Sequence, residues 1–117
     1  MRYLMLVVAD PDLTDGEEPV QTIEQWVDET YGQGRATDGD RLRPPSHAKT
    51  IRRRNGKVTV TDGPFAETHE WIAGFDLLEC DTLEQAVEIA TRHPMATHGS
   101  IEPVSYTHLT LPTILRV

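Results

Sequence analysis

The stretch Asp62 to Glu70 brings several ionisable side chains of this chain together within nine residues. It opens with Asp-Gly-Pro, which favours a rigid turn because glycine tolerates positive φ and proline fixes its own φ. Asp62, Glu67 and His69 would then lie on a firm loop beside a strand, with Phe65 as an apolar anchor. Turns of this kind commonly carry functional groups. The stretch is therefore the first candidate for a site.

Proton transfer is the chemistry that these side chains could perform. If burial raises the pKa of Asp62, its carboxylate can act as a general acid or base. The alternative is a turn aspartate that accepts backbone N–H bonds and is chemically inert, and the pattern alone favours this second interpretation. His93 and His69 titrate near neutrality and could shuttle protons. Their respective alternatives are a cation at a helix end, stabilised by the helix dipole, and a solvated loop residue.

The sequence gives little support for the binding of an anion, a metal or a cofactor. Arg52 belongs to a run of three arginines that could bind an anion, although a solvated strand edge that resists edge-to-edge pairing explains the run more simply. The histidines and the single Cys80 share no metal-ligand spacing, so we expect no metal and no cofactor. No phosphate-binding loop or nucleophile elbow is recognisable in the sequence.

Composition bounds the function further. The 117 residues carry 11 basic and 19 acidic side chains, a net charge of −8, and suffice for one domain with one modest core. This charge argues against direct binding of nucleic acid or of an anionic membrane. One cysteine excludes an internal disulfide, and no apolar run reaches the roughly 18 residues of a membrane span. We therefore expect a cytoplasmic protein.

The elements that must position these residues follow from periodicity. A turn-rich loop is expected at 35–46, and Asn55-Gly56 predicts a tight hairpin. Pro19 is expected at the first position of the first helix, with Val20, Ile23 and Val27 on its apolar stripe and Trp26 and Tyr31 widening that stripe. Thr82 and Gln85 predict a capping box for the second helix. The expected strands are 3–9, 47–54, 57–61, 71–80 and one beginning at 100, and the expected helices are 19–32 and 82–93.

This order predicts a ferredoxin-like α+β sandwich, in which a four- to five-stranded, mainly antiparallel sheet carries two helices on one face. The other face has no helix to cover it. A second copy of the chain is the natural cover, so we expect a homodimer.

The residues 62–68, read as Asp-Gly-Pro-Phe-Ala-Glu-Thr, resemble the signature of the DGPF-type proteins, a branch of the YCII-related family. The resemblance covers residues 1–104. It is supported by Gly56 before the motif, by Gly74-Phe75 after it, and by Glu84-Gln85-Ala86, Arg92-His93-Pro94 and 99–102. His69 departs from the pattern, because the family usually has lysine there.

The resemblance implies a dimeric α+β barrel in a bacterial cytoplasm. It implies a suspected enzymatic activity that rests on a characteristic histidine and aspartate, and a link to transcription initiation. Asp62 is the residue carried over for catalysis, with His93 second, and Phe65, Glu67, His69 and Arg52 are the expected ligand-binding residues.

Two functions stay open. The first is a small-molecule enzyme that uses Asp62 in acid–base chemistry such as isomerisation or lyase-type proton transfer. The second is a non-catalytic ligand-sensing or protein-interaction module with a transcription-related partner. Residues 105–117 depart from the family pattern, and we expect them to be a non-native or disordered tail outside the domain.

Overall fold

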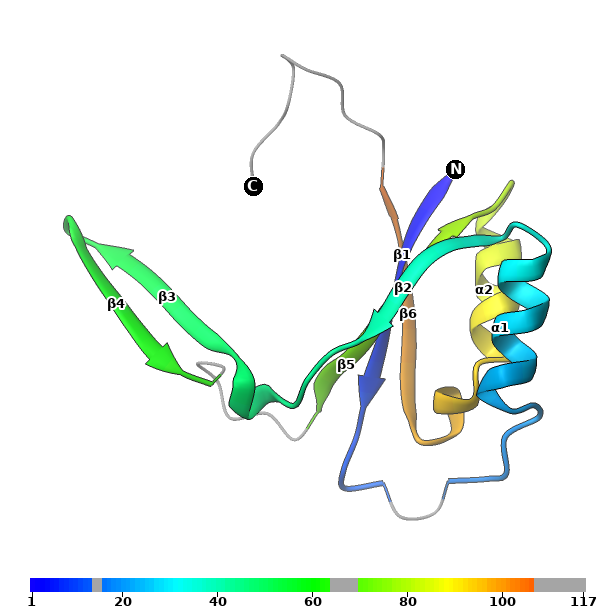
Figure 1. Cartoon of the computed structure of the whole chain (residues 1–117), viewed down its shortest axis with the longest axis horizontal. Coiled ribbons are helices and arrows are strands. Elements are labelled where there is room, and N and C mark those ends of the chain that lie inside the picture. The colour runs from blue at the N-terminus through cyan, green and yellow to red at the C-terminus, as the bar shows by residue number, and fades with distance from the viewer. Residues whose placement is uncertain (14–15, 64–69, 107–117) are drawn as a thin grey trace.

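The computed structural model describes residues 1–13, 16–63 and 70–106, which form two helices and two antiparallel sheets (Figure 1). Four strands make the main sheet in the order β2-β5-β1-β6, and two more form a separate hairpin. In chain order the elements are β1 (Arg2–Ala9), α1 (Ile23–Gly32), β2 (Ala36–Arg41), β3 (Lys49–Arg54), β4 (Lys57–Asp62), β5 (Trp71–Glu79), α2 (Leu83–Thr91) and β6 (Gly99–Tyr106).

The predicted α+β class is confirmed. Every neighbouring pair of strands in the main sheet is antiparallel, and α1 and α2 lie side by side on one face of it (Figure 1). Residues that are directly opposite each other share a face, so Tyr3 and Leu78 point to the helices while Leu4 and Leu77 point away from them. The described part of this single chain forms an open sheet and not a closed barrel.

The prediction of a loop at 35–46 is wrong in its first half, because β2 runs along the edge of the sheet there. Its sequence, Ala-Thr-Asp-Gly-Asp-Arg, has few of the β-branched and aromatic residues that mark a strand. Its pairing with β5 fixes it as a strand, with an irregularity in the register between Ala36 and Asp38. Tertiary pairing therefore overrides local propensity at this edge.

The hairpin of β3 and β4 is the converse case. Asn55 and Gly56 both adopt positive φ, at 53° and 75°, which confirms the tight turn. The expectation that these strands join the main sheet is wrong, because they pair only with each other in the described structure. Figure 1 shows the hairpin projecting away from the body of the molecule. Ile51 and Val60, which are opposite each other, remain 67% and 61% exposed.

Helix α1 begins later than Pro19, so that prediction is wrong. Thr22 is the cap: its hydroxyl accepts from the N–H of Gln25, whose side chain accepts in return from the N–H of Thr22. The buried side of the helix is formed by Trp26 and Thr30, while Val20 lies outside the helix and is 78% exposed. The expected stripe is therefore confirmed for Trp26 and Tyr31, which pack in or against the core. It is wrong for Val20, Ile23 and Val27, which stay exposed.

The core lies between the helices and the sheet. Trp26 fastens α1 to α2, because its indole N–H donates to the carbonyl of Ile89 at 3.0 Å. Thr82 caps α2 as predicted, although Gln85 reaches back to the N–H of Asp81 and not to that of Thr82. The buried cluster consists of Tyr3, Met5, Val7, Trp26, Ala36, Leu78, Cys80, Ala86, Ile89 and Ala90.

Strand β6 continues to Tyr106, two residues past the expected domain boundary, and pairs with β1 throughout. Residues 107–117 lie outside the described residues, so the prediction about their origin stays a prediction. Neither of the helices described here has the length and apolar character that a membrane crossing requires.

Candidate functional site

A cleft of about 1030 Å³ opens between α1 and the half of the sheet formed by β2 and β5. Two helix-facing positions of the sheet that line it, Gly39 and Gly74, have no side chain. The walls are mostly apolar and aromatic, and a few ionisable groups are set into them. The lining residues on which the site depends are Trp26, Tyr31, Gly39, Trp71, Asp76 and His93.

Asp76 is the ionisable group set into the floor of the cleft. It lies on β5 opposite Met5 and so faces the helices, where it is half-buried. The hydroxyl of Tyr31, from α1, donates to its Oδ1 at 2.5 Å. Burial raises the pKa of Asp76 above its usual value, and the hydrogen bond from Tyr31 opposes that rise. The arrangement holds a carboxylate of increased basicity in a fixed orientation.

Tyr31 is held in its protonated form. Burial is the largest cause that raises the pKa of Tyr31, followed by its hydrogen bond to Asp76 and the negative charges of Asp76, Asp38 and Asp40. The phenol therefore acts as a donor over the physiological range of pH.

Gly39 makes this hydrogen bond possible. A Cβ atom at this position would lie 2.5 Å from the Tyr31 hydroxyl and 2.6 Å from the carbonyl oxygen of Phe75, and it would also meet the carboxylate of Asp76. The pairing of Gly39 with Asp76 in the sheet puts the missing side chain directly beneath the two partners. The position must be glycine for the Tyr31–Asp76 contact to form.

His93 forms part of the wall next to Trp26, and only 5% of its surface is exposed. Its ring lies 4.7 Å from that of Trp26, with the planes at 65°. The Nδ1 atom accepts from the N–H of Met95 at 3.0 Å, which assigns the ring proton to Nε2. Burial lowers the pKa of His93 to about 4, so the imidazole is neutral near pH 7. The alternative of a charged histidine at a helix end is therefore wrong.

The residues expected at the site from sequence are separated. Of the three that the structure describes, Asp62, Arg52 and His93, only His93 lines the cleft. Asp62 ends β4, is exposed and pairs with Lys49, and Arg52 lies on the projecting hairpin. Phe65, Glu67 and His69 lie outside the described residues. The functional roles of these five residues stay predictions.

The sequence contains one local signal for Asp76, although this residue lies outside the 62–70 motif. It is a lone carboxylate within the apolar run 71–78, where a solvated strand face was the available explanation. Its partner Tyr31 is 45 positions away, so no local pattern could connect them.

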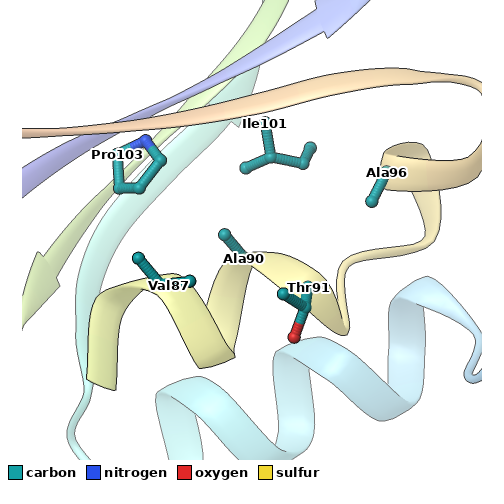
Figure 2. A pocket seen from close by; sticks show the side chains of 6 residues that line it. All are labelled: Val87, Ala90, Thr91, Ala96, Ile101 and Pro103. Atoms are coloured by element: carbon teal, nitrogen blue, oxygen red, sulfur yellow. The ribbon is translucent and has the colours of Figure 1, made fainter. Parts of the chain in front are cut away.

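A second, smaller pocket of about 300 Å³ lies between α2, the turn at Ala96 and β6 (Figure 2). It is lined by Val87, Ala90, Thr91, Ala96, Ile101 and Pro103. Its walls carry no ionisable group, so it offers a ligand little beyond apolar contact. Across the described residues, no three His, Cys, Asp or Glu side chains are grouped so that they could hold a metal ion.

Comparison with known proteins agrees with the resemblance noted in the sequence. The family model described as YCII-related domain matches residues 1–110. A protein of Rhizobium meliloti (strain 1021), described as uncharacterised, is 46% identical over 96 residues, a match that covers 77% of each chain. The chain therefore belongs to the YCII-related family.

Proposed function

We propose that this YCII-related protein binds a small organic molecule in the cleft beneath α1 and moves a proton to or from it. The observation that carries the proposal is the half-buried carboxylate of Asp76, held by Tyr31 at the floor of the cleft. A carboxylate of raised pKa is a stronger base than one in water, which suits proton abstraction in an isomerisation or a lyase-type reaction.

The division of roles follows from protonation states. Asp76 is the base in this proposal, and Tyr31 orients it and can give up its hydrogen bond to a bound molecule. His93 contributes a neutral Nε2–H donor, which fits an oxygen atom that gains negative charge during the reaction. Asp76 takes the place that the sequence motif suggests for Asp62, because Asp62 is exposed and paired with Lys49.

The experiment begins with a thermal-shift screen of small metabolites, since a ligand that binds the folded state raises its melting temperature. Each hit is then incubated with the protein in D₂O, and loss of C–H signal is followed by proton NMR. We expect catalysed exchange with the wild-type protein and none with Asp76→Asn, while Asp62→Asn retains it. If Asp76→Asn exchanges the hit as fast as wild type, the assignment of the base is wrong.

A second candidate, an interaction module, is favoured by the sheet face that points away from the helices. Leu4 and Leu6 are opposite Leu77 and Phe75 there, and Val104 on β6 is 50% exposed. A solvent-facing sheet rarely presents such a continuous apolar strip, and the family resemblance implies a dimer. We propose a second copy of this chain as its cover.

Charge supports self-association as well. The hairpin segment 49–62 holds five basic residues and one acidic residue, a net charge of +4. Because the whole chain has a net charge of −8, the rest of the chain has a net charge of −12. The hairpin of one copy would therefore be attracted to the body of another.

Sedimentation equilibrium at micromolar concentration tests this assembly. We expect a dimer for the wild type and for the control Val20→Asp, whose side chain is exposed away from the sheet, and a monomer for Val104→Asp. A monomeric wild type would overturn the homodimer proposal and would favour a different protein partner for the apolar strip, such as the transcription-related one that the resemblance implies.

A further inference from the structure

The charge around the cleft is unbalanced toward the negative. Asp76 faces the cleft, whereas the exposed Asp38 and Asp40 border it from β2, opposite Leu77 and Phe75 on the other face of the sheet. Arg41 is the one guanidinium among the described lining residues. None of the three carboxylates forms an ion pair within the described residues, whereas Glu29 and Glu79 each pair with an arginine. The carboxylates of Asp38 and Asp40 instead accept the N–H of the next residue, at 2.9 and 2.8 Å. These three acids and Arg41 together put a net charge of −2 in and beside the cleft, and no ion pair within the described residues offsets the acids.

The electrostatic effect converges on one point. The charges of all three carboxylates contribute to raising the pKa of Tyr31, so the potential at its hydroxyl is negative. That hydroxyl donates a hydrogen bond to the carboxylate of Asp76. A positive group placed there would be attracted by all three acids together.

The walls beside this point are aromatic. Trp26 and Tyr31 meet edge to face, with ring centres 6.3 Å apart, and Trp71 also lines the cleft. Aromatic faces attract cations through their quadrupole, and they also accommodate an apolar body. Negative charge and aromatic walls therefore favour the same class of ligand.

His93 offers the ligand a hydrogen-bond donor in addition to the negative charge and the aromatic walls. It is about nineteen-twentieths buried, it lines the cleft, and its Nδ1 is already occupied by Met95. Within the described residues, no protein group accepts from its Nε2–H. Nε2 is not among the fully buried polar atoms without a partner, so its N–H keeps contact with the cleft and can donate to an acceptor atom of a ligand there.

We propose that the cleft recognises a small organic cation: a protonated amine that sits by Asp76 and Tyr31, on an apolar or aromatic body that carries an acceptor atom for His93. This inference rests on the proposed function for the site and narrows the class of ligand. Aliphatic amines are protonated at neutral pH, so the positive charge of the bound amine would balance the negative charge of the Asp76 carboxylate.

Three probes with the same ring and different charge test the proposal: benzylamine, benzyl alcohol and benzoate. Each is titrated into ¹⁵N-labelled protein at pH 7.5, and binding is followed through the indole N–H of Trp26 and the amide of Gly39. We expect benzylamine to bind at least about fivefold more tightly than either other probe, a difference typical of one partly solvated charge contact.

Two matched variants locate the effect. Asp76→Asn should remove the preference for benzylamine and leave the affinity for benzyl alcohol unchanged. Asp28→Asn makes the same change on α1 outside the cleft, at an exposed residue, and should keep the preference. The comparison among probes uses the wild-type protein, so it holds even if Asp76→Asn fails to fold.

The two levels of the proposal fail differently. Equal or tighter binding of benzoate or benzyl alcohol at these resonances would overturn the cation preference and leave the cleft as a binding site. If no probe shifts the resonances of the cleft at millimolar concentration, the proposed function of the cleft is itself contradicted.

Discussion

Replacing Gly39 by alanine is the most direct perturbation of the site. The new methyl group would lie 2.5 Å from the Tyr31 hydroxyl and 2.6 Å from the backbone oxygen of Phe75. The Tyr31 side chain can rotate away, but a paired strand carbonyl cannot move cheaply. The substitution should therefore break the hydrogen bond between Tyr31 and Asp76 and also strain the pairing of β2 with β5.

The magnitude can be estimated from these two effects. Overpacking of a fitted site costs about 1–3 kcal/mol, and a lost hydrogen bond to a charged group costs about 1.5–3 kcal/mol. The cleft is open to water, so both effects should lie near their lower ends, and we expect Gly39→Ala to lower the free energy of unfolding by about 3 kcal/mol. For a domain of this size, that corresponds to a fall in melting temperature of about 12 °C.

Thermal unfolding followed by circular dichroism measures the change. Gly32→Ala is the matched control: a Cβ atom there meets nothing within 4 Å, so we expect its stability to stay within about 1 kcal/mol of wild type. The variant Tyr31→Phe should lessen the cost of Gly39→Ala, because the hydroxyl that clashes has gone. If Gly39→Ala and Gly32→Ala have the same melting temperature, the claim that the Tyr31–Asp76 contact requires glycine at position 39 is refuted.

Three further predictions concern the ionisable groups and the core. In the folded state the pKa of His93 is lowered from 6.5 to about 4, so as the pH falls the unfolded chain protonates this histidine before the folded chain does. The free energy of unfolding of the wild type should therefore decrease as the pH drops from about 6.5 to about 4. Urea unfolding should show a smaller decrease for His93→Gln. Without the donor, Tyr31→Phe should raise the pKa of Asp76 further, as a carboxyl ¹³C NMR titration would show; an unchanged or lower value would contradict the described hydrogen bond. Trp26→Phe removes the indole donor from the carbonyl of Ile89, which keeps only the N–H of Arg92 at 3.3 Å, and also loses buried ring surface. It should cost about 2–3 kcal/mol in chemical denaturation, and a loss below roughly 0.5 kcal/mol would show that the indole bond does not hold α1 to α2.

Local signals in the sequence predicted much of the fold. Asn55-Gly56 predicts its turn because both residues tolerate positive φ, and Thr82 predicts the start of α2 because its hydroxyl satisfies a free N–H. The chain order of strands and helices was enough for the α+β class. The start of α1 carries the same kind of signal at Thr22 and Gln25, three residues after the proline at which the helix was expected to begin.

The site depends on contacts that no local pattern contains. Gly39 is a turn-forming residue in its own segment, and it becomes the floor of a cleft only because β2 pairs with β5. Asp76 and Tyr31 are on different elements and meet through the packing of α1 on the sheet. The neutral state of His93 likewise follows from burial, which the sequence does not give. No described residue of the motif segment 62–70 lines the cleft.

The separate hairpin has an evolutionary consequence. Because β2 and β5 are already neighbours in the sheet, the hairpin segment 49–62 is an appendage to the main sheet, and none of its residues lines the cleft. Insertions or deletions within this appendage would leave the floor, walls and helices of the cleft in place. Selection could therefore reshape what the appendage meets without disturbing the cleft beneath α1.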